Sequence, residues 1–280
     1  MDAATFLAGS GKERIDRFKE RLRRAAGDPA LEEAIHDLRV SIRRLLAWID
    51  AWERLVGPAA GLRDARSSLK KLMSPLGKLR DAHVKRDGIR KLVPAGDDPS
   101  YMYAVLVASD VLRREREGRR LLGEKWPAGI RIGVPERGQA HGGDVAAEAR
   151  RLLAGSAGNV ARHREASLDP GNPDALHRMR LAFKKHRYAW ELFSPLFPDA
   201  GDAAAKRLHD FQTLLGTIHD CDVVLAEAHS FMKGVAGYRG RSDIETAFRK
   251  RRKEKFLEFR RIAGTARGLY GILHAGLRAR

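Results

Sequence analysis

The sequence predicts an all-α fold, built as an internally duplicated helical bundle. Apolar residues recur at helical spacing along most of the chain, and no strand-rich stretch stands out beyond one linker. The segment HDLRVSIRRLLAWIDAW at 36–52 also occurs a second time, in altered form, as HRMRLAFKKHRYAWELF at 177–193. We therefore expect two halves of about four to five helices each, related by an approximate two-fold axis.

In the first half, turn and capping residues divide the chain into predicted helices. Gly27 ends the first helix, and Asp28 followed by Pro29 is typical of the start of the next one. Gly57 follows that helix, and the Leu-Gly-x-x-x-Asp pattern at 76–81 marks the end of the third. The expected helices cover about 11–26, 29–57, 59–79, 82–94 and 100–122.

A Gly- and Pro-rich segment at 123–143 lacks a sustained period, so we expect it to be the linker between the halves. A short extended piece is expected inside it at 130–134. Asn172 and Pro173 start the repeated helix of the second half by the same capping logic. The second half is expected to form helices at about 144–165, 173–194, 199–216, 220–235 and 242–275. The predicted halves, 10–122 and 144–275, make up one domain.

One face of each repeated helix carries a row of basic side chains. An advance of about 100° per residue places His36, Arg39 and Arg43 on one narrow stripe. The counterpart in the second copy consists of His177, Arg180, Lys184 and Arg187. The opposite stripe is apolar, so each helix can bury one face. Its members are Leu38, Ile42, Leu45, Ile49 and Trp52 in the first copy and Met179, Phe183, Tyr188 and Trp190 in the second.

The charge of the chain indicates a polyanionic partner. Lys and Arg outnumber Asp and Glu by 54 to 36, which gives a formal net charge of +18 and a pI near 10.5. Like charges three, four and seven residues apart on a helix repel each other unless anions lie between them. A linear phosphate chain can bridge such cations, because Arg binds two phosphate oxygens and Lys offers a mobile charge. The basic run at 249–255 would widen this footprint or form a solvated helix face.

A second pattern follows each basic helix about 40 residues later. The pieces are LGKLRDAHV at 76–84 and LGTIHDCDVV at 215–224. With the two His-x-x-Arg helices, they make four motif pieces in an order that resembles the CHAD domain, the "conserved histidine α-helical domain", over roughly residues 10–275. The resemblance implies an all-helical, duplicated fold that binds inorganic polyphosphate through a basic surface or channel, with no established catalytic activity.

The resemblance also implies which residues bind. If the two copies are related by a pseudo-two-fold, their basic stripes would face a shared axis and form one cationic lining. Alignment of the copies pairs Lys70 with His209 and Arg80 with His219. The expected polyphosphate-binding residues are His36, Arg39, Arg43, Arg44, Lys70, Lys78, Arg80, His177, Arg180, Lys184, Lys185, Arg187 and His209.

The two copies differ in ways that bear on this site. Leu46 stands where the second copy has Arg187, and His83 replaces the aspartate kept at Asp222. His186 lies off the basic stripe and is expected to pack inside. A structural role for the two motif histidines, in which they tie helices together, stays open.

Two other functional classes compete with polyphosphate binding. A nucleic-acid-binding protein would share the positive charge, but the sequence shows no helix-turn-helix register, zinc-ligand spacing or aromatic RNA motif. An enzyme of phosphate transfer would need a P-loop, an acidic pair for Mg²⁺ or a nucleophile elbow, and none is found. We therefore expect a non-catalytic binding protein without cofactor or metal, with a general polyanion or nucleic-acid binder as the alternative.

Cys221 is the single cysteine, so no internal disulfide can form and a reducing cytoplasm fits best. A metal site among its His and Asp neighbours is conceivable, although a structural cysteine is favoured. The N-terminal segment turns charged within a dozen residues, unlike a signal peptide. The longest apolar run, Tyr101–Ala108, is too short to span a bilayer, so we expect a soluble protein. Association with polyphosphate granules is one role that its binding would serve.

Overall fold

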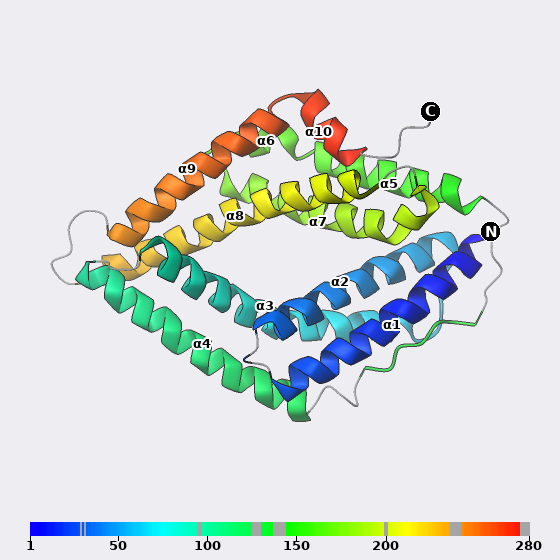
Figure 1. Cartoon of the computed structure of the whole chain (residues 1–280), viewed down its shortest axis with the longest axis horizontal. Helices are drawn as coiled ribbons and strands as arrows, with labels where there is room; N and C mark the ends of the chain where they lie inside the picture. Colours follow the sequence, from blue (N-terminus) through cyan, green and yellow to red (C-terminus); the bar gives the residue numbers. More distant parts are fainter. Residues whose placement is uncertain are drawn as a thin grey trace. The chain divides into compact units, whose positions relative to one another are not determined.

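The computed structural model describes residues 1–28, 30, 32–93, 97–124, 130–136, 144–198, 201–235 and 242–274. Within these ranges the chain forms helices and no β-strand, so the all-α prediction is confirmed (Figure 1). The helices are α1 (Ala3–Gly27), α2 (Glu32–Leu55), α3 (Leu62–Leu92), α4 (Asp98–Glu124), α5 (Val145–Ala161), α6 (Arg164–Ser167), α7 (Pro173–Phe193), α8 (Gly201–Lys233), α9 (Asp243–Ala263) and α10 (Ala266–Leu273), with a 3-10 turn, η1 (Ser194–Leu196), after α7.

Contacts between residues divide the chain into two compact units. Unit 1 comprises Met1–His83, Asp110–Leu152 and Tyr188–Leu196. Unit 2 comprises Val84–Ser109, Leu153–Arg187 and Phe197–Arg280. The boundary falls inside α3, α4, α5 and α7, so the units differ from the two sequence halves. The duplication, and the halves with the linker between them, therefore stay predictions.

Within unit 1, α1 and α2 pack side by side (Figure 1). Gly11 permits the close approach, because a Cβ at this position would lie 2.5 Å from the Trp48 ring. The Trp48 indole donates a 2.7 Å hydrogen bond to the carbonyl of Leu7. The expected start of this helix at residue 11 is wrong, because Asp2 caps an earlier turn by accepting a hydrogen bond from the Thr5 amide.

The predicted apolar stripe of α2 lies in the core. Its five side chains are at most 1% exposed, and they are Leu38, Ile42, Leu45, Ile49 and Trp52. Full burial of one such side chain stabilises the fold by about 1.5–3 kcal/mol. The stripe of α7 is buried as well, and it consists of Met179, Phe183, Tyr188 and Trp190. Both apolar stripes are therefore confirmed.

The Leu-Gly-x-x-x-Asp pieces lie inside continuous helices, so the predicted breaks after residues 79 and 216 are wrong. α3 runs from Leu62 to Leu92 and α8 from Gly201 to Lys233. A glycine inside a helix costs only about 1 kcal/mol relative to alanine. Buried side chains on both sides of each glycine offset this cost. They are Leu76, Leu79 and Ala82 in α3 and Leu215, Ile218 and Val224 in α8.

The end of the chain forms two helices where one was expected. Ser242 starts α9 with a capping box, in which its hydroxyl accepts from the Glu245 amide and the Glu245 carboxylate accepts from the Ser242 amide. α9 ends at Ala263, and Thr265 caps α10 by accepting a hydrogen bond from the Gly268 amide. The cap at residue 265 therefore divides the predicted helix at 242–275, whose last residue lies outside the described ranges.

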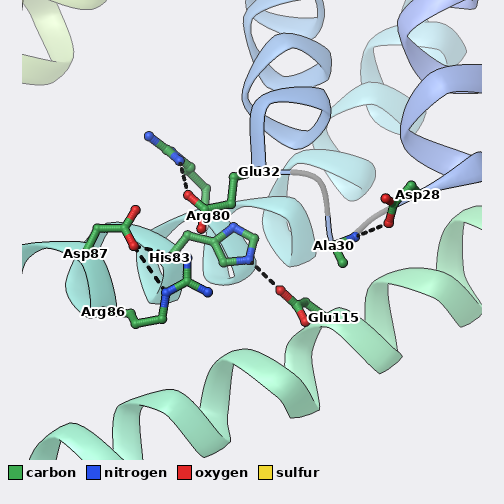
Figure 2. Close-up of polar contacts among 8 residues, drawn as sticks. All are labelled: Asp28, Ala30, Glu32, Arg80, His83, Arg86, Asp87 and Glu115. Atoms are coloured by element: carbon green, nitrogen blue, oxygen red, sulfur yellow. Dashed lines mark hydrogen bonds and ion pairs between the residues drawn. The ribbon is translucent and has the colours of Figure 1, made fainter. Parts of the chain in front are cut away.

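The helix that carries the second basic stripe begins as predicted. The Asn172 side chain accepts a 3.0 Å hydrogen bond from the Ala175 amide, which caps α7. At the matching place before α2, Asp28 accepts a 3.0 Å hydrogen bond from the Ala30 amide (Figure 2). Pro29 itself lies outside the described residues.

Part of the expected linker is described, and it is irregular. Residues 130–136 form neither helix nor strand, so the extended piece expected at 130–134 is not a β-strand. Ile132 nevertheless is buried, with 9% of its area exposed. The segments 125–129 and 137–143 lie outside the described residues.

His186 packs inside unit 2, as predicted. Its side chain is fully buried, and its Nδ1 lies 2.7 Å from the Ser156 hydroxyl while its Nε2 lies 3.0 Å from the Leu273 carbonyl. Burial lowers the pKa of this histidine to about 4. His186 is therefore a neutral structural residue that joins α5, α7 and α10.

Candidate functional site

The basic site of unit 1 is built around Arg39 of α2. This side chain is 9% exposed, and its Nη1 donates a 2.7 Å hydrogen bond to the Leu76 carbonyl of α3. A Cβ at position 77 would lie 3.1 Å from the same Nη1, so Gly77 leaves room for the guanidinium. The Leu-Gly pair of the motif is therefore the place on α3 where Arg39 docks.

Other cations surround Arg39. Burial, together with the neighbouring Arg43 and Arg80, lowers its pKa to about 10, while Asp81 opposes them. Arg39 remains protonated at neutral pH, but it is partly dehydrated and close to like charges. An anion that approached these side chains would relieve that repulsion.

His36 belongs to the same group of charges. Partial burial is the main cause that lowers the pKa of His36. The charges of Arg80, Arg43 and Arg39 also lower it, while the Asp37 carboxylate raises it. His36 is therefore neutral at pH 7 and can donate one hydrogen bond. The structure thus brings together four predicted residues, which we call cluster 1 and which are His36, Arg39, Arg43 and Arg80.

Arg80 also takes part in an ion pair within unit 1. Its Nη1 lies 3.5 Å from Glu32 Oε2 at the start of α2 (Figure 2). About a quarter to a third of each of the two side chains is exposed, at 28% and 29%. Such a pair contributes about 1 kcal/mol or less, so Arg80 can turn toward an incoming anion at little cost.

The basic site of unit 2 contains a pair of histidines. His177 of α7 and His219 of α8 face each other, with 3.2 Å between their Nδ1 atoms and 4.5 Å between ring centroids. A hydrogen bond between two Nδ1 atoms needs one of them protonated and the other bare. The contact therefore requires that at least one of the two imidazoles is neutral.

Burial and nearby cations keep both histidines of this pair neutral. Burial lowers the pKa of His219 to about 3, assisted by Arg180, His177 and Lys184. The pKa of His177 is lowered by burial and then by Arg180 and Lys184, with Asp174 opposing. We call His177, Arg180, Lys184 and His219 cluster 2. His219 was not among the predicted binding residues. Its alignment with Arg80, which was among them, is the sequence signal that could have identified it.

Two more predicted residues lie on the same helix faces as these clusters. On α3, Lys70 precedes Gly77 by seven residues and therefore shares its face. On α8, His209 and Gly216 have the same relation. Both Lys70 and His209 are exposed. A Cβ on Gly216 would meet nothing within 4 Å, so the close contact seen at Gly77 is not repeated at Gly216.

The remaining predicted residues lie outside the two clusters. Arg44 Nε lies 3.0 Å from Glu191 Oε2, and Arg44 also contributes to a lowered pKa at Arg14. Arg187 Nε donates a 2.7 Å hydrogen bond to Gln212 Oε1. Lys78 and Lys185 are exposed. Phosphate contact stays a prediction at these four positions, as it does at the other predicted residues.

The position that differs between the copies carries a structural contact in each. His83 is fully buried, and its Nε2 lies 3.0 Å from Glu115 Oε1 on α4 (Figure 2). Asp222 instead accepts from Arg252 of α9, whose guanidinium also donates to the Pro170 carbonyl at 3.0 Å. The first copy thus pairs a histidine with an acid, Glu115, where the second copy pairs an aspartate with a base, Arg252.

The basic run at 249–255 is therefore divided in its roles. Arg252 points into unit 2, and Lys255 forms an ion pair with Glu258 at 2.8 Å. Arg249, Lys250 and Lys253 are exposed on α9.

A metal centre at the cysteine receives no support. Cys221 is buried, and burial raises the pKa of its thiol to about 11, so the free thiol stays protonated at neutral pH. In the part of the chain that the structure describes, no group of three or more His, Cys, Asp or Glu residues is placed to hold a metal ion. No helix among the described residues is long and apolar enough to cross a membrane.

Comparison with known proteins agrees with this architecture. The CHAD domain from the plant Ricinus communis is similar at a TM-score of 0.61 and 17% identity, over 100% of this chain and 94% of that one. PptA from Streptomyces chartreusis is similar at a TM-score of 0.63 and 17% identity, over 94% and 98% of the two chains. A comparison with curated proteins gives no match.

These structural likenesses, at such low identity, concern the fold alone. The family itself is established by the sequence, because the model for the CHAD domain matches residues 11–229, which is more than half of the chain. The motif helices α2 and α7 and most of α8 fall within that match. The chain belongs to the CHAD domain family.

Proposed function

We propose that this protein binds inorganic polyphosphate through clusters 1 and 2, without catalysing a reaction. The CHAD domain family is linked to polyphosphate binding in general, which supports the choice of ligand. The observation that carries the proposal is the setting of Arg39, which is almost completely buried and hydrogen-bonded to a backbone carbonyl. A carbonyl orients the guanidinium but does not cancel its charge, so the charge stays available to an anion.

The arrangement of the cations fits a repeating phosphate chain. Neighbours on one helix face stand about 5–6 Å apart, and they repel each other when no anion is present. Each cluster also draws a side chain from a second helix, Arg80 in cluster 1 and His219 in cluster 2. Polyphosphate has neither bases nor sugars, so charge and spacing suffice for its recognition.

The neutral histidines add to this ligand in two ways. His36 and His177 can donate a hydrogen bond to a phosphate oxygen while neutral. The negative charge of a bound chain would also raise their pKa and let them carry a positive charge. Both effects favour phosphate over a ligand that makes only nonspecific contacts.

A general polyanion or nucleic-acid binder is the second candidate, and the exposed cations of α9 favour it. Arg249, Lys250 and Lys253 lie at the surface in a chain of net charge +18. Such cations bind any phosphate backbone, with an affinity that falls steeply with salt.

The leading proposal, polyphosphate binding through clusters 1 and 2, includes a location. We propose that the protein acts in the cytoplasm and associates with polyphosphate granules.

The test of the proposed site is a charge reversal on the less buried members of both clusters. The variant Arg43→Glu with Lys184→Glu is expected to lower the affinity for long-chain polyphosphate at least tenfold while its circular dichroism stays unchanged. The matched control is Lys12→Glu with Arg23→Glu, which changes the net charge equally at exposed positions of α1. Equal losses in the two variants would show that overall charge, and not the clusters, carries the binding.

A further inference from the structure

The N-terminal part of α4 exposes an apolar face. Four large side chains within six residues are about half exposed or more: Tyr101 at 68%, Met102 at 53%, Val105 at 48% and Leu106 at 51%. The small residues Ala108 and Ser109 continue the same exposed side. Soluble proteins rarely leave a contiguous apolar patch of this kind uncovered, and such patches mark interaction sites.

The opposite face of this segment is already used. Tyr103 and Val107 are buried in the unit 2 core, together with Val224, Ile244 and Phe248. The segment is therefore apolar on both sides, although the described residues of unit 2 cover only one of them. A helix that is apolar all round is normally buried all round, so the exposed side indicates a partner.

The charges along α4 restrict what that partner is. No Lys or Arg occurs from residue 97 to residue 112 of a chain whose net charge is +18. Nucleic acid and anionic lipid need cations at their binding surface, and residues 97–112 of this face offer none. By contrast, two copies of this basic chain would repel each other least along a stretch without cations.

The helix is also complementary to itself when two copies run antiparallel. At 3.6 residues per turn, the midline of the exposed face passes through Asp98, Met102, Val105, Ser109 and Arg116. An antiparallel partner centred near residue 107 would set Asp98 opposite Arg116, Met102 opposite Leu112 and Val105 opposite Ser109. Asp98 and Arg116 are both exposed, as these charge contacts require.

We propose that the face of α4 formed by Tyr101, Met102, Val105, Leu106 and Ser109 is a self-association surface that takes the same face of a second copy. The contact is isologous, with Val105 of one copy facing Ser109 of the other and the reverse. The small side chains near the centre let the two helices approach closely. The five residues of this face are few beside the roughly 20–30 per partner of a standard interface, so the dimer is weak and forms as concentration rises.

The first test is sedimentation of the full chain over a wide range of concentration, at a salt concentration high enough to screen its charge. The mass of the unchanged protein should rise from one copy toward two, and the variant Val105→Glu should stay at one copy. The matched control is Leu257→Glu, since Leu257 is 49% exposed on α9 against 48% for Val105. A wild-type chain that stays monomeric throughout, or a control that dissociates equally, would overturn the proposal.

The second test fixes the register and does not depend on the stability of a charged variant. A protein with Val105→Cys is mixed with one carrying Ser109→Cys and oxidised; the native Cys221 is buried and should not compete. The mixed disulfide dimer should form faster than either like pair, because only the mixed pair brings the two sulfurs into reach. Equal rates for all three pairs would overturn the antiparallel arrangement. Neither test involves clusters 1 and 2, so the outcome is independent of polyphosphate binding.

Discussion

The guanidinium of Arg39 is packed against Gly77, with 3.1 Å between its Nη1 and the place where a Cβ on residue 77 would lie. The same Nη1 donates to the carbonyl of Leu76, the preceding residue. At Gly216, the matching position of the second motif, a Cβ would meet nothing within 4 Å. Two motif pieces that are alike in sequence therefore differ in the space beside their glycine.

This difference predicts opposite effects of the same substitution. Gly216→Ala should raise the free energy of unfolding by about 1 kcal/mol, because alanine favours the helix and meets open space. Gly77→Ala gains the same propensity but pushes on Arg39, whose charged hydrogen bond is worth about 1.5–3 kcal/mol. Its net effect should be zero or destabilising. Urea unfolding of both variants checks this, and an equal stabilisation would show that Arg39 is not held by the glycine.

The histidine pair predicts a loss of stability in acid. The pKa of His219 falls from 6.5 in the unfolded chain to about 3 in the folded one, so the folded state binds fewer protons between these values. The stabilisation is therefore fully present above pH 6.5 and is lost as the pH falls toward 3. Urea unfolding at several pH values should show a shallower acid loss for His219→Gln than for the unchanged protein. The exposed His209→Gln serves as control and should keep the original slope.

Polyphosphate binding should take up protons at the same pair. In the free protein both imidazoles are neutral, and the charge of a bound phosphate chain raises the pKa of each. Affinity should therefore rise as the pH falls from about 8 to 6. Calorimetry in buffers of different protonation enthalpy measures the uptake directly, with long chains so that terminal phosphates contribute little.

The double variant His177→Asn with His219→Asn is the control for this effect. It should bind with a smaller proton uptake and a flatter dependence on pH. An unchanged uptake in this variant would assign the protons to other groups, His36 of cluster 1 first among them.

The buried contact of His83 predicts a coupled pair of substitutions. His83→Asp, which restores the residue type found at Asp222, would place two carboxylates together at Glu115. We expect it to destabilise the fold by about 3 kcal/mol or more, since an unpaired buried charge is costly. Adding Glu115→Arg should recover part of the loss, because the pair would then have opposite charges. A double-mutant cycle by chemical unfolding measures this coupling, and purely additive effects would contradict the contact.

Local signals in the sequence predicted much of the fold. The apolar stripe of α2 is buried at every position, because a helical period and a large core leave one arrangement for those side chains. The start of α7 followed from Asn172, whose side chain caps the helix through a contact only three residues away. The continuity of α3 and α8 was missed, because whether Gly77 ends a helix depends on buried contacts with other segments.

The candidate site was predicted only where it depends on one helix. The stripe of His36, Arg39 and Arg43 follows from helical periodicity, and the structure adds Arg80 to it as the alignment suggested. The sequence did not indicate that Arg39 would be almost fully buried, since a row of cations is expected to face water. Nor could it pair His177 with His219, because that contact depends on how α7 and α8 pack.

The most direct test of the central claim is a competition titration. Labelled long-chain polyphosphate is bound to the purified protein and challenged with equal phosphate equivalents of RNA and of duplex DNA across a salt series. We expect polyphosphate to stay bound at salt concentrations and competitor levels that remove both nucleic acids, because clusters 1 and 2 hold phosphate through partly buried cations. If all three polyanions compete alike with similar salt slopes, the net charge of +18 explains the binding and the clusters are structural.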